Sequence, residues 1–161
     1  MNTKQLFCAL QCQPVTSKYF DGIFAKDTLS DIVAPPQLLV CNTAHSSESG
    51  DHWVLFHFIG SHARFYDPLG LDFSAYGNDF IDFVNMWSTS YEICNVRTQP
   101  SNSSLCGVYC LFFAYFSCKG RSIHTIVKKM KSAQFVKQFV KNMFSICPRY
   151  PCRFLQSCVR K

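Results

Sequence analysis

Strand-like apolar runs occupy the middle of the chain. Residues 52–59 (HWVLFHFI) are almost continuously apolar and rich in residues that favour β-strands, and residues 63–66 continue the pattern after a Gly-Ser pair. Two such runs joined by a short turn that contains glycine predict a β-hairpin. Residues 37–42 (QLLVCN) predict a buried strand before the hairpin, and residues 91–96 predict a further strand after it.

Helical segments are expected on both sides of these strands. Segment 105–118 is almost continuously apolar, follows a Ser/Asn run suited to capping a helix and ends at Lys119-Gly120, so it predicts a buried central helix. The other segments expected to be helical are residues 3–12, 27–31, 73–87, 122–131 and 133–146. Helices at both ends with strands in the middle predict an α+β fold.

Length and composition restrict the class of protein further. A chain of 161 residues suits one hydrophobic core, so we expect a single domain over residues 1–161. Its longest apolar run, residues 108–116, is less than half of the ~20 residues that a membrane-spanning helix needs. The apolar stretch near the N-terminus is too short for a secretory signal, so we expect a protein that is not secreted.

Ten cysteines are spread along the chain without a CxxC pair. Zinc sites use closely paired ligands that recur at a distance, and these spacings fit that pattern poorly. Because neither a signal peptide nor a small core calls for disulfides, we expect most of the thiols to be buried as small apolar groups, and we expect no metal site.

Basic residues are concentrated in the C-terminal quarter. Residues 1–118 hold five Lys/Arg and all ten Asp/Glu, whereas residues 119–161 hold eleven Lys/Arg and no acidic residue. A solvated helix face is one explanation of such a segment. The complete absence of carboxylates favours a polyanionic partner for this basic, helical segment at about 119–161.

Four residues occupy positions that thiol-dependent hydrolysis requires. Cys106 lies at the predicted start of the buried helix, where unpaired N–H groups and the helix dipole favour a thiolate. His52 opens one hairpin strand and Asp67 follows the other, so the hairpin can bring the carboxylate beside the imidazole. Gln99 lies on a loop seven residues before Cys106, where its amide could help to bind an oxyanion.

Each of these residues also has an ordinary structural explanation. Cys106 could be one more core cysteine, His52 a packing residue, Asp67 a turn residue before proline and Gln99 a surface side chain. Gly107 leaves room for a substrate backbone beside Cys106. Position alone leaves these alternatives open, and it is the combination that favours catalysis.

The order His, acid, Gln, Cys resembles the adenovirus endopeptidase (adenain) family, in the clan that includes the deSUMOylating proteases. The segments that carry the resemblance are Asn42-Thr-Ala with His52-Trp53, Tyr66-Asp67-Pro68-Leu69-Gly70, Gln99-Pro-Ser-Asn-Ser-Ser-Leu-Cys106-Gly107, and Tyr19-Phe20-Asp21-Gly22 followed by Asp27. The resemblance covers residues 4 to 120. It departs from adenain at Asp67, where adenain has Glu and the deSUMOylating branch has Asp, and in the shorter segment between Cys94 and Gln99.

The resemblance implies a papain-like cysteine protease of the adenain type, with a small central mixed sheet flanked by helices and the nucleophile at the start of a buried helix. Cys106 is then the nucleophile, His52 the general base and later acid, and Asp67 the residue that orients the imidazole. Gln99 and the Cys106 amide form the oxyanion hole, and Trp53 and Gly107 lie at the substrate cleft. The expected activity is hydrolysis after Gly-containing sites through a thioester acyl-enzyme.

The resemblance also implies activators and a cellular role. DNA and a short viral peptide are the expected activators, with Cys94 as the nearest candidate for a disulfide to the peptide. The residues expected to contact DNA are Lys128, Lys129, Lys131, Lys137 and Lys141. We expect a monomer in the virion and host nucleus that matures viral or transposon precursor proteins. A protease for ubiquitin-like modifiers and a non-enzymatic nucleic-acid-binding module are the alternatives.

Overall fold

The computed structural model of the protein describes residues 1–144 and contains one five-stranded mixed sheet with strand order β1-β2-β3-β4-β5. Strands β2, β3 and β4 pair antiparallel, whereas β1 pairs parallel with β2 and β5 pairs parallel with β4. The strands are β1 (Phe20–Ala25), β2 (Leu38–Asn42), β3 (Trp53–Ile59), β4 (His62–Tyr66) and β5 (Ser90–Cys94).

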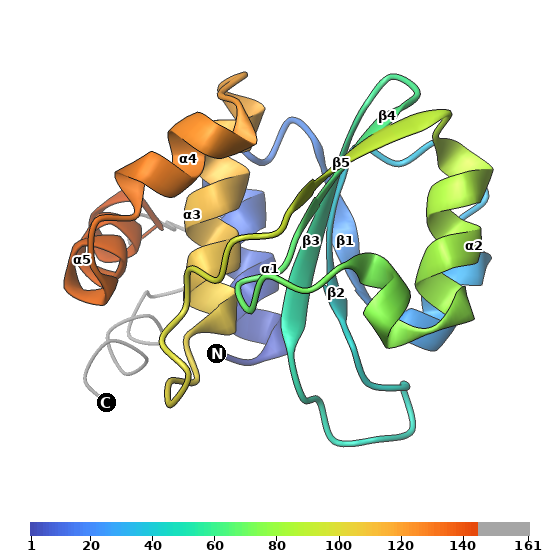
Figure 1. Cartoon of the computed structure of the whole chain (residues 1–161), viewed down its shortest axis with the longest axis horizontal. Helices are drawn as coiled ribbons and strands as arrows, with labels where there is room; N and C mark the ends of the chain where they lie inside the picture. The colour runs from blue at the N-terminus through green and yellow to red at the C-terminus, as the bar shows by residue number, and fades with distance from the viewer. Residues whose placement is uncertain (145–161) are drawn as a thin grey trace.

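Helices cover both faces of this sheet (Figure 1). One face packs against α1 (Thr3–Cys12) and α3 (Cys106–Cys118), with α4 (Ile123–Lys129) and α5 (Ala133–Phe144) lying outside α3. The other face is covered by the 3-10 helices η1 (Lys26–Asp31) and η2 (Phe73–Tyr76) and by α2 (Asn78–Trp87). The α+β fold with a central mixed sheet is therefore confirmed.

Burial on both faces explains why the central strands are continuously apolar. Along β2, Leu38 and Val40 belong to the core beneath α3, and Leu39 and Cys41 belong to the core beneath α2. Successive side chains of a strand point to opposite faces, so a strand covered on both sides needs apolar residues at every position. The predicted hairpin has the same cause and is confirmed, with Leu55 paired to Tyr66.

Strand β1 is an element that the apolar pattern does not predict. It lies at the edge of the sheet, most of its residues are only half-buried, and its register shifts between Phe20 and Gly22. The Asp21 carboxylate accepts hydrogen bonds from the backbone N–H groups of Gln37 and Leu38. An edge strand with an acidic residue, a glycine and little burial carries a weak strand signal.

The helix expected over residues 73–87 is wrong in one respect, because it is interrupted. Gly77 has φ +99°, a conformation outside the helical region, and it separates the 3-10 helix η2 from α2. The other expected helices and strands are present with ends shifted by one to a few residues. The expectation for residues 145–146 lies outside the described residues.

Within residues 1–144, no group of three or more His, Cys, Asp or Glu side chains is arranged to hold a metal ion. Over the same range, no helix is long and apolar enough to cross a bilayer. The thiols of Cys41, Cys94, Cys106 and Cys110 are free and buried. The expectation of buried thiols is thus met at these four positions, whereas Cys8 and Cys118 are free and half-buried and Cys12 is disulfide-bonded. Cys147, Cys152 and Cys158 lie outside the described residues.

Candidate active site

The hairpin brings His52 and Asp67 together. His52 immediately precedes β3, and Asp67 immediately follows β4, so antiparallel pairing places both at one end of the sheet. The His52 Nε2 atom lies 2.6 Å from Asp67 Oδ1. His52 is 8% exposed and Asp67 is fully buried, so the pair is largely removed from water.

Asp67 has hydrogen-bond donors on both carboxylate oxygens. Oδ1 accepts from His52 and from the backbone N–H of Leu69 at 2.8 Å. Oδ2 accepts from the Leu71 N–H at 3.1 Å and from the hydroxyl of Tyr76 at 2.7 Å. Four donors compensate for the burial of a carboxylate, which is otherwise very unfavourable.

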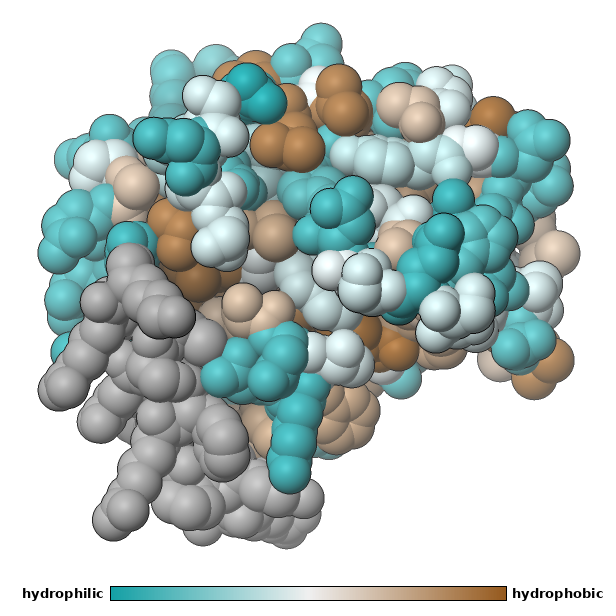
Figure 2. Space-filling model, turned by 90° about the horizontal axis from the view of Figure 1, so that it is seen from below, coloured by the Kyte–Doolittle hydropathy of each residue, from teal (hydrophilic) through white to brown (hydrophobic). Residues whose placement is uncertain are grey.

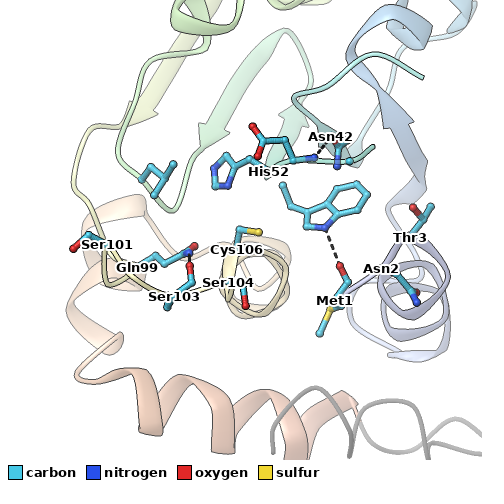
Figure 3. A pocket seen from close by; sticks show the side chains of 14 residues that line it. Met1, Asn2, Thr3, Asn42, His52, Gln99, Ser101, Ser103, Ser104 and Cys106 are labelled. Atoms are coloured by element: carbon cyan, nitrogen blue, oxygen red, sulfur yellow. Dashed lines mark hydrogen bonds between the residues drawn. The ribbon is translucent and has the colours of Figure 1, made fainter. Parts of the chain in front are cut away.

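Cys106 is the first residue of α3, which packs directly on β3. Its side chain lies next to His52 in the pocket drawn in Figure 3, near enough for the imidazole to lower the pKa of the thiol. Because His52 Nε2 is engaged with Asp67, Nδ1 is the ring nitrogen left for the thiol. Cys106 is 8% exposed, so the sulfur lies at the bottom of a pocket and not on the open surface.

The pKa values of the three groups shift toward a charged chain of acid, imidazolium and thiolate. Burial alone lowers the pKa of His52, but its hydrogen bonds with Asp67 and Cys106 outweigh burial and raise it from 6.5 to about 9. Burial raises the pKa of Cys106, yet bonds from His52 and from the Trp53 and Gly107 backbone bring it below 9.0. For Asp67, the effect of burial is exceeded by the donors from His52, Leu69 and Tyr76, so its pKa falls below 3.8.

Gln99 lines the same pocket and is 5% exposed. Its amide Nε2 donates to the carbonyl of Ser103, and its Oε1 has no hydrogen-bond partner. The side chain therefore lies close to Cys106, as expected, with its N–H bonded within its own loop (Figure 3). An N–H held by a loop carbonyl can be redirected to a substrate oxygen by a small change in the loop.

One turn positions both Asp67 and Gln99. The carbonyl of Pro68, the residue after Asp67, accepts hydrogen bonds from the backbone N–H groups of Thr98 and Gln99, each at 3.0 Å. The Tyr66 hydroxyl and Thr98 Oγ1 lie 2.6 Å apart and join the same two segments. The acid and the amide are thus held by one network, although 32 residues separate them in the chain.

Gly70 permits this close approach, and its replacement by alanine is expected to destabilise the protein. A Cβ at Gly70 would lie 2.6 Å from the backbone nitrogen of Arg97, and its φ of +76° also disfavours alanine. Gly60 also has positive φ, +60°, but has open space around it, so Gly60→Ala measures the conformational strain alone. We expect Gly70→Ala to cost at least about 2 kcal/mol more than Gly60→Ala in urea unfolding. Equal costs would show that the contact with Arg97 is unimportant.

The remaining predicted site residues lie in different places. Trp53 lines the pocket, and its indole N–H donates to the Met1 carbonyl at 3.1 Å. Gly107 does not line the pocket, and its Cα faces Met1 and Leu6, where a Cβ would approach to 3.2–3.3 Å. Cys94 is 1% exposed at the end of β5, and burial raises its pKa.

The predicted DNA-contacting lysines lie on the outer helices. Lys128 and Lys129 are in the last turn of α4, Lys131 follows that helix, and Lys137 and Lys141 are in α5. Both helices lie on the α3 side of the sheet in Figure 1. They belong to a stretch, residues 119–144, that has seven basic residues and no acidic one.

The pocket also contains residues to which the sequence assigned no role in the site. Met1, Asn2 and Thr3 form part of its wall, and Asn42 holds the loop above it by accepting the N–H groups of Ala44 and Asp51. On the face seen in Figure 2, the surface is mostly hydrophilic, and its hydrophobic residues are scattered. Such a site can bind a polypeptide backbone by polar contacts around a single reactive sulfur.

No model of a known protein family matches the chain, and no curated protein matches its sequence. Among solved structures, the crystal structure of the ASFV pS273R protease is similar, with a TM-score of 0.64 and 12% sequence identity over 91% of this chain and 67% of that one. At this identity the likeness concerns the fold. The fold of the chain is therefore similar to that of a viral protease, and it places Asp67, His52 and Cys106 together at one end of its sheet.

Proposed function

We propose that this protein is a cysteine endopeptidase that hydrolyses peptide bonds through a thioester acyl-enzyme. The observation that carries the proposal is the His52 imidazole, which is hydrogen-bonded to the Asp67 carboxylate and lies beside the Cys106 thiol in the same pocket. A thiol at the start of a helix, paired with a histidine that a buried acid orients, is the arrangement that activates a sulfur nucleophile.

The reaction follows from this geometry. The Cys106 thiolate attacks the carbonyl carbon of the scissile bond, and the imidazolium of His52 then donates its proton to the departing amine, which leaves a thioester. In the second half, neutral His52 takes a proton from water, the hydroxide attacks the thioester, and the acid product and the thiol are released. Asp67 remains ionised throughout and holds the ring in position.

An oxyanion forms in both halves of the reaction. The Cys106 backbone N–H, at the start of α3, and the Gln99 amide are the proposed donors. Because Gln99 Nε2 is bonded to the Ser103 carbonyl here, the amide must exchange that partner for the substrate oxygen.

The proposed substrates have glycine before the scissile bond, as the resemblance to adenain implies, and are precursor proteins of a virus or transposon matured in the virion and host nucleus. A pocket that places Cys106 at 8% exposure favours a residue without a side chain next to the sulfur. A protease for ubiquitin-like modifiers has the same chemistry and is the second candidate, supported by Asp67 as the acid.

A panel of internally quenched peptides, each with glycine at one position, tests the activity and the specificity. We expect cleavage after glycine, and we expect a peptide with a glycine vinyl sulfone to add to the Cys106 sulfur, as located by mass spectrometry of tryptic fragments. A folded ubiquitin-like modifier with the same C-terminal probe distinguishes the second candidate. Absence of both cleavage and labelling under reducing conditions, with and without DNA, would contradict the proposal.

We further propose that the basic helices bind DNA and that DNA activates the enzyme. The helices α4 and α5 carry four lysines and no carboxylate, and Lys131 lies between them. Lys119 and Lys129 each lie over an aromatic ring of α3, those of Tyr115 and Phe116. A short activating peptide joined through Cys94 is also proposed. Because Cys94 is buried, such a link requires the end of β5 to open.

Reversing three of these charges is expected to weaken DNA binding. The triple change Lys128→Glu, Lys129→Glu and Lys131→Glu removes a cluster of basic groups, so affinity for duplex DNA should fall about tenfold or more at low salt, with a shallower salt dependence. Fluorescence anisotropy at several salt concentrations measures both. Matched changes at Lys4, Lys18 and Lys26, which lie in the N-terminal part, should have a smaller effect. Equal losses would indicate a response to net charge only.

A further inference from the structure

Tyr76 contacts two members of the proposed catalytic group. Its hydroxyl donates to Asp67 Oδ2 at 2.7 Å, and its ring lies beside the His52 ring, with centroids 6.4 Å apart and planes inclined by 30°. In the apolar pattern Tyr76 is one more position of a helix, so this contact is not predicted by the sequence.

The fold holds Tyr76 in this place from several directions. It is the last residue of η2, and that helix is capped by the Asp72 side chain, which accepts the N–H of Ser74. The ring packs edge-to-face on Phe80 of α2, with centroids 5.6 Å apart. Gly77, with φ +99°, ends the 3-10 helix immediately afterwards and lets α2 start in a new direction.

We propose that Tyr76 is a positioning residue for the proposed hydrolysis, one that fixes the Asp67 carboxylate and covers the imidazole of His52. This inference rests on the proposed function. The hydroxyl engages Oδ2, which leaves Oδ1 directed at His52 Nε2. The hydroxyl also withdraws charge from the carboxylate and so limits how strongly Asp67 stabilises the imidazolium.

The pKa of the His52 imidazolium decides how readily it acts as a general acid. His52 must release its proton to the departing amine, and a general acid works best when its pKa lies near the operating pH. Without the Tyr76 hydroxyl, Asp67 has one donor fewer and becomes a stronger acceptor for His52. The pKa of the imidazolium then rises, so His52 releases its proton to the departing amine less readily. Burial and the neighbouring Asp67 raise the pKa of Tyr76, so its hydroxyl remains a donor over the working range.

The change Tyr76→Phe tests this role, because it removes the hydroxyl and keeps the ring against His52 and Phe80. We expect kcat to fall roughly three- to tenfold with an unchanged KM, the factor that one hydrogen bond of ordinary net strength represents. We also expect thiolate formation at Cys106 to move to lower pH and deprotonation of His52 to move to higher pH. Ultraviolet thiolate absorbance, taken as the difference from the matching Cys106→Ala protein, and NMR of the His52 ring measure these shifts.

Tyr91→Phe is the matched control, since Tyr91 is 55% exposed on β5. It should leave both titrations and kcat unchanged. A Tyr76→Phe protein that unfolds earlier in urea but keeps the wild-type titrations would show that Tyr76 only packs, and would overturn the inference. If the wild type cleaves no peptide, the proposed function fails, yet the two titrations still decide whether Tyr76 controls the ion pair.

Discussion

Cys106→Ala is expected to reduce kcat/KM for glycine-containing peptides by about 10⁴-fold or more, to the background rate. Cys106 is the group in the pocket whose pKa is lowered by His52, so without it we expect the remaining residues only to bind the substrate and polarise its carbonyl. The change removes one buried sulfur atom from the end of a helix that is otherwise held by its apolar contacts along α1, α5 and β3. Hydrolysis of the peptide panel, with and without duplex DNA, measures the loss.

Cys118→Ala is the control for this prediction, because Cys118 is a free cysteine at the opposite end of the same helix. Burial raises its pKa to about 12, so its thiol is protonated at neutral pH and does not act as a nucleophile. Wild-type rates are expected for this variant. Hydrolysis that survives in Cys106→Ala would mean that another group, or a contaminating protease, is responsible. Tight DNA binding by an inert wild type, once a missing peptide activator had been excluded, would favour the nucleic-acid-binding alternative.

The placement of His52, Asp67 and Cys106 could be predicted from the sequence because each depends on a strong local signal. A hairpin with a short turn brings residues just outside its two strands together, so His52 and Asp67 meet at a separation of fifteen residues. The apolar run from residue 105 fixes where the central helix begins. What joins Cys106 to the hairpin is the packing of α3 on β3, and that contact is implied only by the resemblance.

The parts that could not be predicted depend on contacts between distant segments or on weak local signals. Strand β1 takes its conformation from pairing with β2, and Asp21 and Gly22 obscure its pattern. The helical spacing predicts Tyr76 as an ordinary core residue. Its hydroxyl reaches Asp67 because the helix is interrupted at Gly77. Similarly, the turn after Asp67 is joined to the loop of Gln99 by the close packing of Gly70 against the Arg97 backbone. The spacing of residues along the chain does not predict this contact.

Asp67→Asn is the second change with a large expected effect, a fall in kcat/KM of about 10²- to 10⁴-fold. Each carboxylate oxygen accepts one backbone N–H, from Leu69 or Leu71, so either orientation of an asparagine amide sets an N–H group against another N–H group. With the amide oxygen kept toward His52, the Leu71 N–H loses its partner in a buried site. We expect a cost of roughly 1–3 kcal/mol in the free energy of unfolding, measured in urea.

The pH dependence of the same variant separates electrostatics from packing. In the wild type, the pKa of His52 is raised from 6.5 to about 9, so its pairing stabilises the fold fully below pH 6.5 and loses that contribution as the pH rises through 9. The pKa of Asp67 is lowered, so its contribution is present above 3.8 and is lost as the pH falls through the lower folded value. The stability difference between wild type and Asp67→Asn should therefore be largest between pH 3.8 and 6.5 and should shrink above 9.

The pH dependence of kcat/KM should reflect the charges of the same two residues, Asp67 and His52. Removing the negative charge lowers the pKa of His52, so the alkaline limb of kcat/KM, near pH 9 in the wild type, should move down by at least about one unit. The exposed Asp82 on α2 supplies the control, and Asp82→Asn should leave the profile in place. Superimposable profiles for wild type and Asp67→Asn would mean that the carboxylate does not govern the imidazolium. Asp67 would then serve the fold alone, through its bonds to Leu69, Leu71 and Tyr76.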